Sequence, residues 1–212
     1  MSKRSVLAIL IPCFTIALLS GCAENPADKT TPAKMSAPFE ETTAAAEGTV
    51  YALANTTSVE FVGSKVTRSH EGGFKTVTGT ITVPDGDLTR AQIKVLIGMT
   101  SLWSDSGKLT GHLKTRDFFE VDTYPESTFI STSITATDSG FSVNGNLTLH
   151  GVTKGITFPA TITISESKAM LNAAAEFHIN RMDFGIEYKG KIDDLIRKEV
   201  VLRFNLQATA TS

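Results

Sequence analysis

The feature that most limits the fold of this chain is a strict alternation of apolar and polar residues in its second half. In one run the apolar positions are Phe141, Val143, Gly145, Leu147 and Leu149. The same period of two runs through residues 156–164 and 200–208. Successive side chains of a strand point to opposite faces of a sheet. The period therefore predicts antiparallel strands with one buried and one hydrated face.

Further stretches fit the same interpretation, near residues 57–66, 74–83, 91–101, 127–137 and 169–179. Turn residues separate them, and Asp138-Ser139-Gly140 between two alternating runs is a hairpin signal. Together these runs predict eight meandering strands and an all-β fold, either a barrel or a sandwich.

Two segments, residues 103–126 and 180–198, interrupt the alternation and are too long for hairpin turns. In the first, Asp105 or Ser106 is placed to cap a short helix that runs to about Arg116. In the second, we expect a helical turn near residues 192–196. Long connections of a compact barrel are usually lids or functional loops.

The start of the chain resembles an export signal. Lys3 and Arg4 precede an apolar stretch, and Leu19-Ser20-Gly21-Cys22 resembles the lipobox of bacterial lipoproteins. This resemblance implies that residues 1–21 are removed and that Cys22 is acylated; the alternative is an ordinary signal peptide with a chance cysteine. Because Ala23 replaces the Asp that retains many lipoproteins in an inner membrane, we expect the periplasmic face of an outer membrane.

Composition divides the chain beyond the leader into two parts. Residues 22–47 are rich in Ala, Thr, Pro, Lys and Glu and have few large apolar side chains, which predicts a disordered tether. Residues 48–210 have the size of one domain. Both cysteines, Cys13 and Cys22, precede that domain, so we expect no disulfide and no thiol chemistry in it.

Charge and motif content argue against several classes of function. Without a basic block, the chain lacks the electrostatic signature of a nucleic-acid-binding protein. The four histidines lack the spacing of a metal-binding helix, and we expect no metal and no cofactor. There is no Gly-x-Ser-x-Gly elbow and no phosphate-binding glycine loop. We therefore expect no enzymatic activity.

Three blocks carry a resemblance to a known family: residues 112–129, which include His112-Leu113-Lys114-Thr115-Arg116-Asp117-Phe118-Phe119 and Tyr124-Pro125-Glu126; residues 145–154; and residues 179–186. On these blocks the chain resembles the YceI-like family over residues 50–209. The resemblance implies an eight-stranded, lipocalin-like antiparallel barrel, exported, that binds polyisoprenoid or other long-chain lipids. The Asp-Pro pair that often precedes Ser58 in that family is absent, which leaves the exact ligand open.

The interior of such a barrel is just wide enough for side chains or one slender ligand. Several inward positions are small, and they either let large neighbours interdigitate or leave a tunnel: Gly145, Ala160, Ala173, Ala175 and Ala208. As residues of the interior and mouth that contact the ligand we expect Phe61, Phe74, Trp103, Phe118, Phe119, Phe129, Phe141, Leu147, Phe158, Phe177, Arg181 and Phe204.

Four of these candidates have two interpretations. Phe118 and Phe119 either gate the mouth or form an ordinary apolar lid. Trp103 is either an aromatic rim for the ligand or a core anchor. The guanidinium of Arg181 suits an anionic head group, or it is structural and pairs with Asp117 or Asp183.

These observations predict a lipid-anchored periplasmic protein that sequesters a polyisoprenoid, an isoprenoid quinone or a fatty acyl compound inside its barrel. The alternative is an interaction or stress-response domain whose barrel is filled by its own side chains. A weaker alternative is an enzyme that acts on lipid or amide substrates. The sequence leaves the oligomeric state open, a homodimer included.

Overall fold

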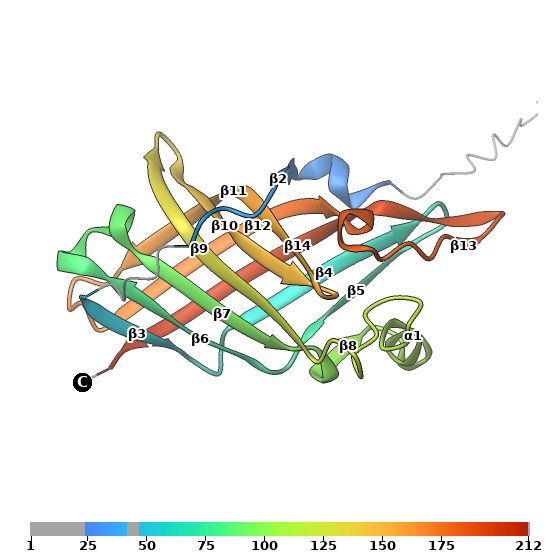
Figure 1. Cartoon of the computed structure of the whole chain (residues 1–212), viewed down its shortest axis with the longest axis horizontal. Coiled ribbons are helices and arrows are strands. Elements are labelled where there is room, and N and C mark those ends of the chain that lie inside the picture. The colour runs from blue at the N-terminus through green and yellow to red at the C-terminus, as the bar shows by residue number, and fades with distance from the viewer. Residues whose placement is uncertain (1–23, 42–46, 212) are drawn as a thin grey trace, which may run out of the picture.

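In the computed structural model, which describes residues 24–41 and 47–211, the main body is a closed eight-stranded antiparallel barrel (Figure 1). Four consecutive strands form a meander: β9 (Glu126–Thr137), β10 (Gly140–Leu149), β11 (Val152–Ile164) and β12 (Met170–Asn180). The long C-terminal strand β14 (Asp194–Ala210) pairs with β12 and closes the ring. The predicted eight-stranded barrel is confirmed.

The first three strands of the barrel are interrupted. β3 (Thr49–Leu53) and β4 (Ser58–Lys65) both pair with β14. β5 (Ser69–Phe74) and β6 (Val77–Val83) pair with β4 and β3, while β7 (Gln92–Gly98) and β8 (Leu102–Ser104) pair with β6 and β5. The predicted strand 74–83 therefore spans a break, where Ser101 Oγ accepts the backbone N–H groups of Lys75 and Thr76.

Short helices fill the connections. Four of the five 3-10 turns in the described residues are η1 (Pro26–Lys29), η2 (Pro84–Gly86), η3 (Leu88–Arg90) and η4 (Met99–Ser101). The predicted helix of the first long connection is α1 (Gly107–Leu113), capped by Ser106 Oγ, which accepts from Leu109 N. None of the helices in the described part of the chain is both long and apolar enough to cross a membrane.

The predicted helical turn near residues 192–196 is wrong. That segment is a hairpin of β13 (Gly190–Lys191) with the start of β14, and the helical turn of this connection is η5 (Arg181–Phe184), directly after β12. Together α1, η5, this hairpin and the β4–β5 turn make up one end of the barrel, which we call the α1 end. The C-terminus lies at the opposite end (Figure 1).

Residues 24–41 differ from the disordered tether that composition predicted. β1 (Thr31–Pro32) pairs with β12, and β2 (Lys34–Ser36) pairs with β11. At the end of this segment Phe39 N donates to Asn146 Oδ1 at 2.8 Å, and Asn146 Nδ2 returns a bond to Phe39 O at 2.9 Å. The segment is thus fastened to the outside of the barrel. Cys22 and the leader lie outside the described residues.

The N-terminal segment covers an apolar patch on the outside of the barrel, formed by Val62 and Val201. Val62 and Val201 face away from the barrel's interior, yet they are 5% and 1% exposed because Ala27 packs on them. Thr30 Oγ1 lies 2.9 Å from His178 Nδ1, which fixes the segment against β12. Composition missed this because a single buried alanine and a few hydrogen bonds leave no hydrophobic pattern.

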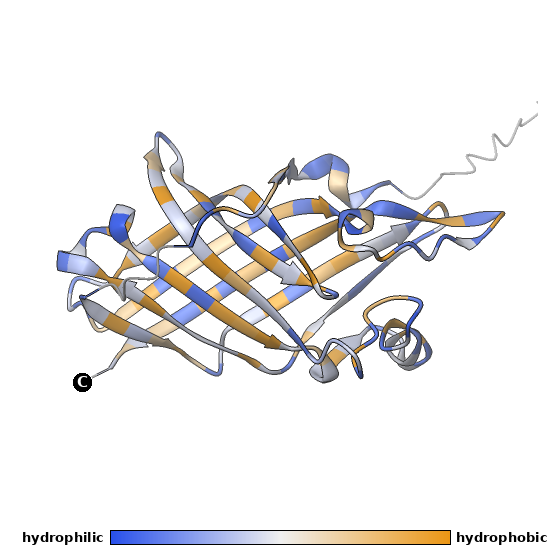
Figure 2. Ribbon diagram, viewed as in Figure 1, coloured by the Kyte–Doolittle hydropathy of each residue, from blue (hydrophilic) through white to orange (hydrophobic). Residues whose placement is uncertain are grey.

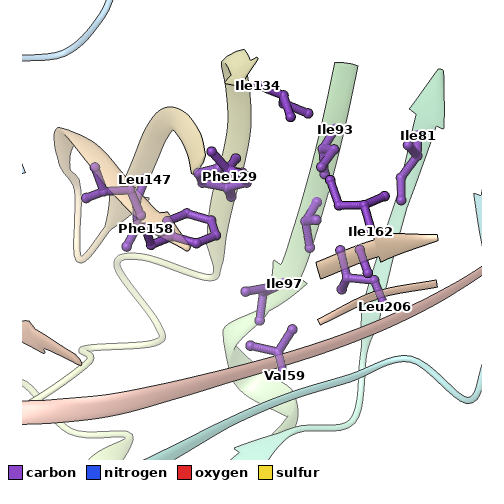
Figure 3. Packing of buried hydrophobic residues seen from close by; sticks show 14 of the residues in the cluster. Val59, Ile81, Ile93, Ile97, Phe129, Ile134, Leu147, Phe158, Ile162 and Leu206 are labelled. Atoms are coloured by element: carbon purple, nitrogen blue, oxygen red, sulfur yellow. The ribbon is translucent and has the colours of Figure 1, made fainter. Parts of the chain in front are cut away.

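The barrel interior holds a large apolar core, and a second apolar cluster of Phe61, Leu102, Leu113, Phe118 and Ile186 lies at the α1 end. Figure 3 shows Val59 beside Ile97 and Phe129 beside Phe158, side chains from four strands of this core. Apolar and polar residues alternate along the strands in Figure 2, as the period of two predicted.

Candidate functional site

An apolar cavity of about 130 Å³ lies inside the barrel toward the α1 end. Seven of the predicted ligand contacts line it: Phe61, Phe74, Phe118, Phe119, Leu147, Arg181 and Phe204. A dry apolar cavity of about 150 Å³ is large enough to bind benzene, so this volume has room for about five or six carbon atoms of a slender chain. The cavity fits one slender apolar ligand.

A second, smaller cavity of about 30 Å³ lies in the other half of the barrel. Phe129 and Phe158 line it, together with three of the small inward residues, Ala160, Ala173 and Ala175. Phe204 lines both cavities and is therefore the side chain between them. The small residues thus do two things that the sequence left open: they let large neighbours interdigitate, and they leave some free space.

Four aromatic rings cross the barrel between these spaces, and we call them the phenylalanine partition: Phe129, Phe158, Phe177 and Phe204. Phe158 and Phe177 stack with centroids 4.3 Å apart, and Phe177 and Phe204 are 5.9 Å apart with their planes at 12°. Phe177 is fully buried and lines neither cavity. In the structure the partition limits the larger cavity on its inner side.

A glycine makes room for the partition. An added Cβ at Gly145 would lie 2.5 Å from the Phe129 ring and 2.5 Å from Ile130 O, closer than real contacts allow. The register of β9 and β10 shifts at Asn144 and Gly145, so the backbone bulges there. The absence of a side chain at Gly145 lets the Phe129 ring lie against β10.

At the α1 end, aromatic rings close the larger cavity. Phe61, Phe74 and Phe119 form a triangle with centroid separations of 5.9, 6.1 and 6.2 Å. Phe118, from the same connection as Phe119, contacts Tyr188 across a centroid distance of 5.2 Å. These contacts join the two long connections into one cover.

Two residues of this cover, His112 and Tyr188, were not among the predicted ligand contacts. His112 of α1 meets Phe118 and Tyr188 edge-on, with centroids 5.0 and 5.1 Å away. Its Nε2 lies 2.9 Å from Asp117 Oδ2, so Asp117 holds the ring in place. Tyr188 stands in a stretch without periodicity, and no signal in the sequence points to this contact.

Arg181 is buried, only 5% exposed, and lines the cavity. Its partners differ from the predicted Asp117 and Asp183: Nε donates to Arg197 O at 3.1 Å, Nη1 donates to Ile186 O, and Nη2 donates to Ile196 O at 3.5 Å. Burial lowers the pKa of Arg181 from its ordinary value. These bonds use three of its five N–H groups and fasten η5 to the start of β14.

The remaining predicted contacts lie away from both cavities. Trp103 packs against β5, where an added Cβ at Gly73 would lie 3.1 Å from its Nε1, and Phe141 faces Ala136 and Ala160 on the neighbouring strands. Neither lines a cavity. Over residues 24–41 and 47–211, no group of three or more His, Cys, Asp or Glu side chains is arranged to hold a metal ion.

The sequence model of the YceI-like domain matches residues 51–208, which is the whole barrel from β3 onward. The chain belongs to the YceI-like family. A UPF0312 protein of Pseudomonas putida strain W619 is 37% identical over 127 residues, and the match spans 56% of this chain and 65% of that relative. A UPF0312 protein of Pseudomonas fluorescens strain SBW25 is 32% identical over 62% of this chain and 71% of its own length.

Two solved structures share the fold of this YceI-like chain. BcnA of Burkholderia cenocepacia superimposes with a TM-score of 0.66 at 23% identity, over 72% of this chain and 96% of that one. A polyisoprenoid-binding domain from Saccharophagus degradans superimposes with a TM-score of 0.62 at 19% identity, over 76% and 98%. At these identities the likeness establishes the barrel architecture.

Proposed function

We propose that this YceI-like protein is a non-enzymatic binding protein that holds one long apolar chain inside its barrel at the periplasmic face of a bacterial membrane. The observation that carries the proposal is the apolar cavity, lined by side chains of the barrel strands and covered at the α1 end by Phe61, Phe118 and Phe119. The polyisoprenoid-binding name of the Saccharophagus degradans neighbour supports the same ligand class.

Apolar area supplies the binding free energy. Burial of about five methylene groups at about 0.8 kcal/mol each contributes about 4 kcal/mol before the cost of association is subtracted. A polyisoprenoid, an isoprenoid quinone or a fatty acyl compound presents such a chain. Its polar head would lie beside Arg181, whose guanidinium suits an anion or a carbonyl group.

The leader and Cys22 support the location. A basic start, an apolar stretch and the small-small-Cys ending indicate export and acylation, and Ala23 favours transfer to an outer membrane. Mass spectrometry of the mature N-terminus tests this part: acylated Cys22 supports the anchor, and a mature chain that starts elsewhere without lipid contradicts it.

The test of ligand binding is mass spectrometry of organic extracts from the purified full-length chain. A co-purifying prenyl or acyl species is the expected result, and Leu149→Trp, which fills the cavity, should lose it. Ile164→Trp is the matched control, because Ile164 is also half-buried but lies outside the cavity. Empty extracts from the wild-type chain, together with no uptake of added fatty acid, would overturn the proposal in favour of a self-filled interaction domain.

A further inference from the structure

Exposed apolar side chains concentrate at the α1 end of the barrel. Among the described residues, seven large hydrophobic side chains are exposed, and five of them belong to this end: Val66, Met182, Tyr188, Ile192 and Leu195. Figure 2 shows the apolar colour at the tip of the β13–β14 hairpin, which projects furthest from the barrel. An apolar cluster on an otherwise hydrated surface marks an interaction site.

Ile192 is the clearest member of this cluster. It is 96% exposed in the two-residue turn between β13 and β14, where Gly, Asn or Asp is the usual choice. The Ile192 side chain is therefore almost entirely in contact with solvent and gains no stability from packing within the fold. A large apolar residue at such a tip is favourable only against an apolar medium.

The tip is held in a fixed position beside the cavity. Asp194 in the hairpin accepts from Lys65 Nζ at 2.6 Å and from Thr67 Oγ1 at 2.9 Å. Lys65 pairs in register with Ile196, and both residues line the cavity. Whatever the tip binds therefore lies next to the ligand's path.

The N-terminal segment reaches the same end. Ser64 Oγ donates to Asn25 Oδ1 at 3.4 Å, and Ser64 also lines the cavity. Cys22 precedes Glu24 by two residues, which span at most about 7 Å of extended chain. A lipid on Cys22 would thus hold the α1 end, rather than the C-terminal end, against the bilayer (Figure 1).

We propose that the α1 end docks on a phospholipid bilayer through Ile192, Leu195 and Tyr188, and that the cavity exchanges its apolar chain directly with that bilayer. The exchange rests on the proposed ligand-binding function; the docking does not. Lys189 and Lys191 of the hairpin are offset by Glu187 and Asp193. Docking is therefore driven by apolar contact and changes little with salt or with anionic lipid.

Tryptophan quenching tests the docking on the full-length chain. Ile192→Trp and Met170→Trp are made in a Trp103→Phe background, which removes the single native tryptophan. Met170 is the matched control, because it is exposed and apolar but lies at the opposite end. With phosphatidylcholine vesicles that carry brominated acyl chains, we expect strong loss of emission at position 192 and none at position 170. Equal quenching at both positions, or none at 192, overturns the proposal.

A kinetic measurement separates docking from ligand binding. Ile192→Ser should slow transfer of a fluorescent fatty acid from vesicles to the protein about tenfold while leaving the equilibrium affinity in solution unchanged. If the chain retains no fatty acid at all, the proposed function fails while the quenching result still decides the docking. If fatty acid binds and transfer is as fast in Ile192→Ser as in wild type, direct exchange with the bilayer is contradicted, while the proposed ligand binding stands.

Discussion

Phe204 stacks on Phe177 with ring centroids 5.9 Å apart and planes at 12°, and it stands between the two cavities of the barrel. The larger cavity in front of it holds about five or six carbon atoms by volume. A longer chain must therefore displace this ring or remain partly outside the barrel. Phe204 thus sets the length of chain that enters without rearrangement.

Phe204→Ala is expected to join the cavities and to extend the accepted chain. In wild type, the affinity for saturated fatty acids of increasing length should level off once the chain reaches the ring. In the variant it should continue to rise, by about fourfold per added methylene, since each contributes about 0.8 kcal/mol. Dissociation constants across the series, measured by displacement of a fluorescent fatty acid, check this.

The control for this change is Phe141→Ala, which removes the same side chain outside both cavities. Both variants should lower the free energy of unfolding, by about 3 kcal/mol when the ring is well packed. Only Phe204→Ala should change the chain length at which the affinity for fatty acids levels off. An unchanged plateau in Phe204→Ala would show that the ring does not limit chain length.

We expect the main role of Arg181 to be stabilisation of the fold rather than contact with the ligand. Arg181→Met keeps the apolar stem but leaves three carbonyl groups, those of Ile186, Ile196 and Arg197, without their donor. The free energy of unfolding should fall by about 3 kcal/mol, because buried acceptors without partners are costly. For a domain of this size that lowers the Tm by roughly 6–12 °C in calorimetry.

Arg181→Lys serves as the companion variant. Lysine keeps the charge but lacks the planar fork that reaches three carbonyls, so its Tm should fall between those of wild type and Arg181→Met. Ligand retention should fall in parallel with stability. Normal Tm with lost retention in either variant would instead assign Arg181 to the ligand's head group.

Period-two alternation predicted antiparallel strands in a barrel or a sandwich, because every strand of such a fold must present its apolar residues to one interior face. The resemblance to the YceI-like family distinguished the barrel from the sandwich. The breaks between β5 and β6 and between β7 and β8 were missed: Ser101 satisfies the backbone at one break, and a side-chain acceptor leaves no periodic signal. Residues 192–196 were misassigned because Ile192 occupies the first position of the two-residue turn, where a large apolar residue is unusual.

Sequence identified the cavity only in part. Alternation separates inward from outward residues, so Phe61, Leu147 and Phe204 were correctly placed inside the barrel. Alternation does not tell how far along the barrel axis an inward residue lies. It therefore could not distinguish the residues that line the cavity from Phe177, which is inward but packed on all sides. The aromatic contact of His112 with Tyr188 depends on two connections meeting in space, which spacing along the chain does not encode.

The N-terminal segment should contribute to the stability of the barrel. Ala27→Asp places a charge against Val62 and Val201, which are nearly fully buried beneath Ala27. We expect the segment to detach or the protein to lose about 2 kcal/mol, since an unpaired polar group is costly in such a site. Ala37→Asp, at an exposed position of the same segment, is the control. Equal resistance of the two variants to limited proteolysis would show that the segment does not depend on this contact.

The hairpin at the α1 end should respond to acid through Asp194. The hydrogen bonds from Lys65 and Thr67 hold the pKa of this carboxyl below its ordinary value of 3.8. A carboxyl with a lowered folded-state pKa stabilises the fold above pH 3.8, and this contribution is lost as pH falls through the lowered value. The hairpin should therefore stay closed at neutral pH and loosen only in strong acid.

Hydrogen exchange at the Ile196 amide, which donates to Lys189 O at 3.0 Å, reports the loosening. Asp194→Asn should exchange faster at neutral pH and lose the acid step, whereas Asp193→Asn should keep it; an acid step that persists in Asp194→Asn would assign the response to another carboxyl.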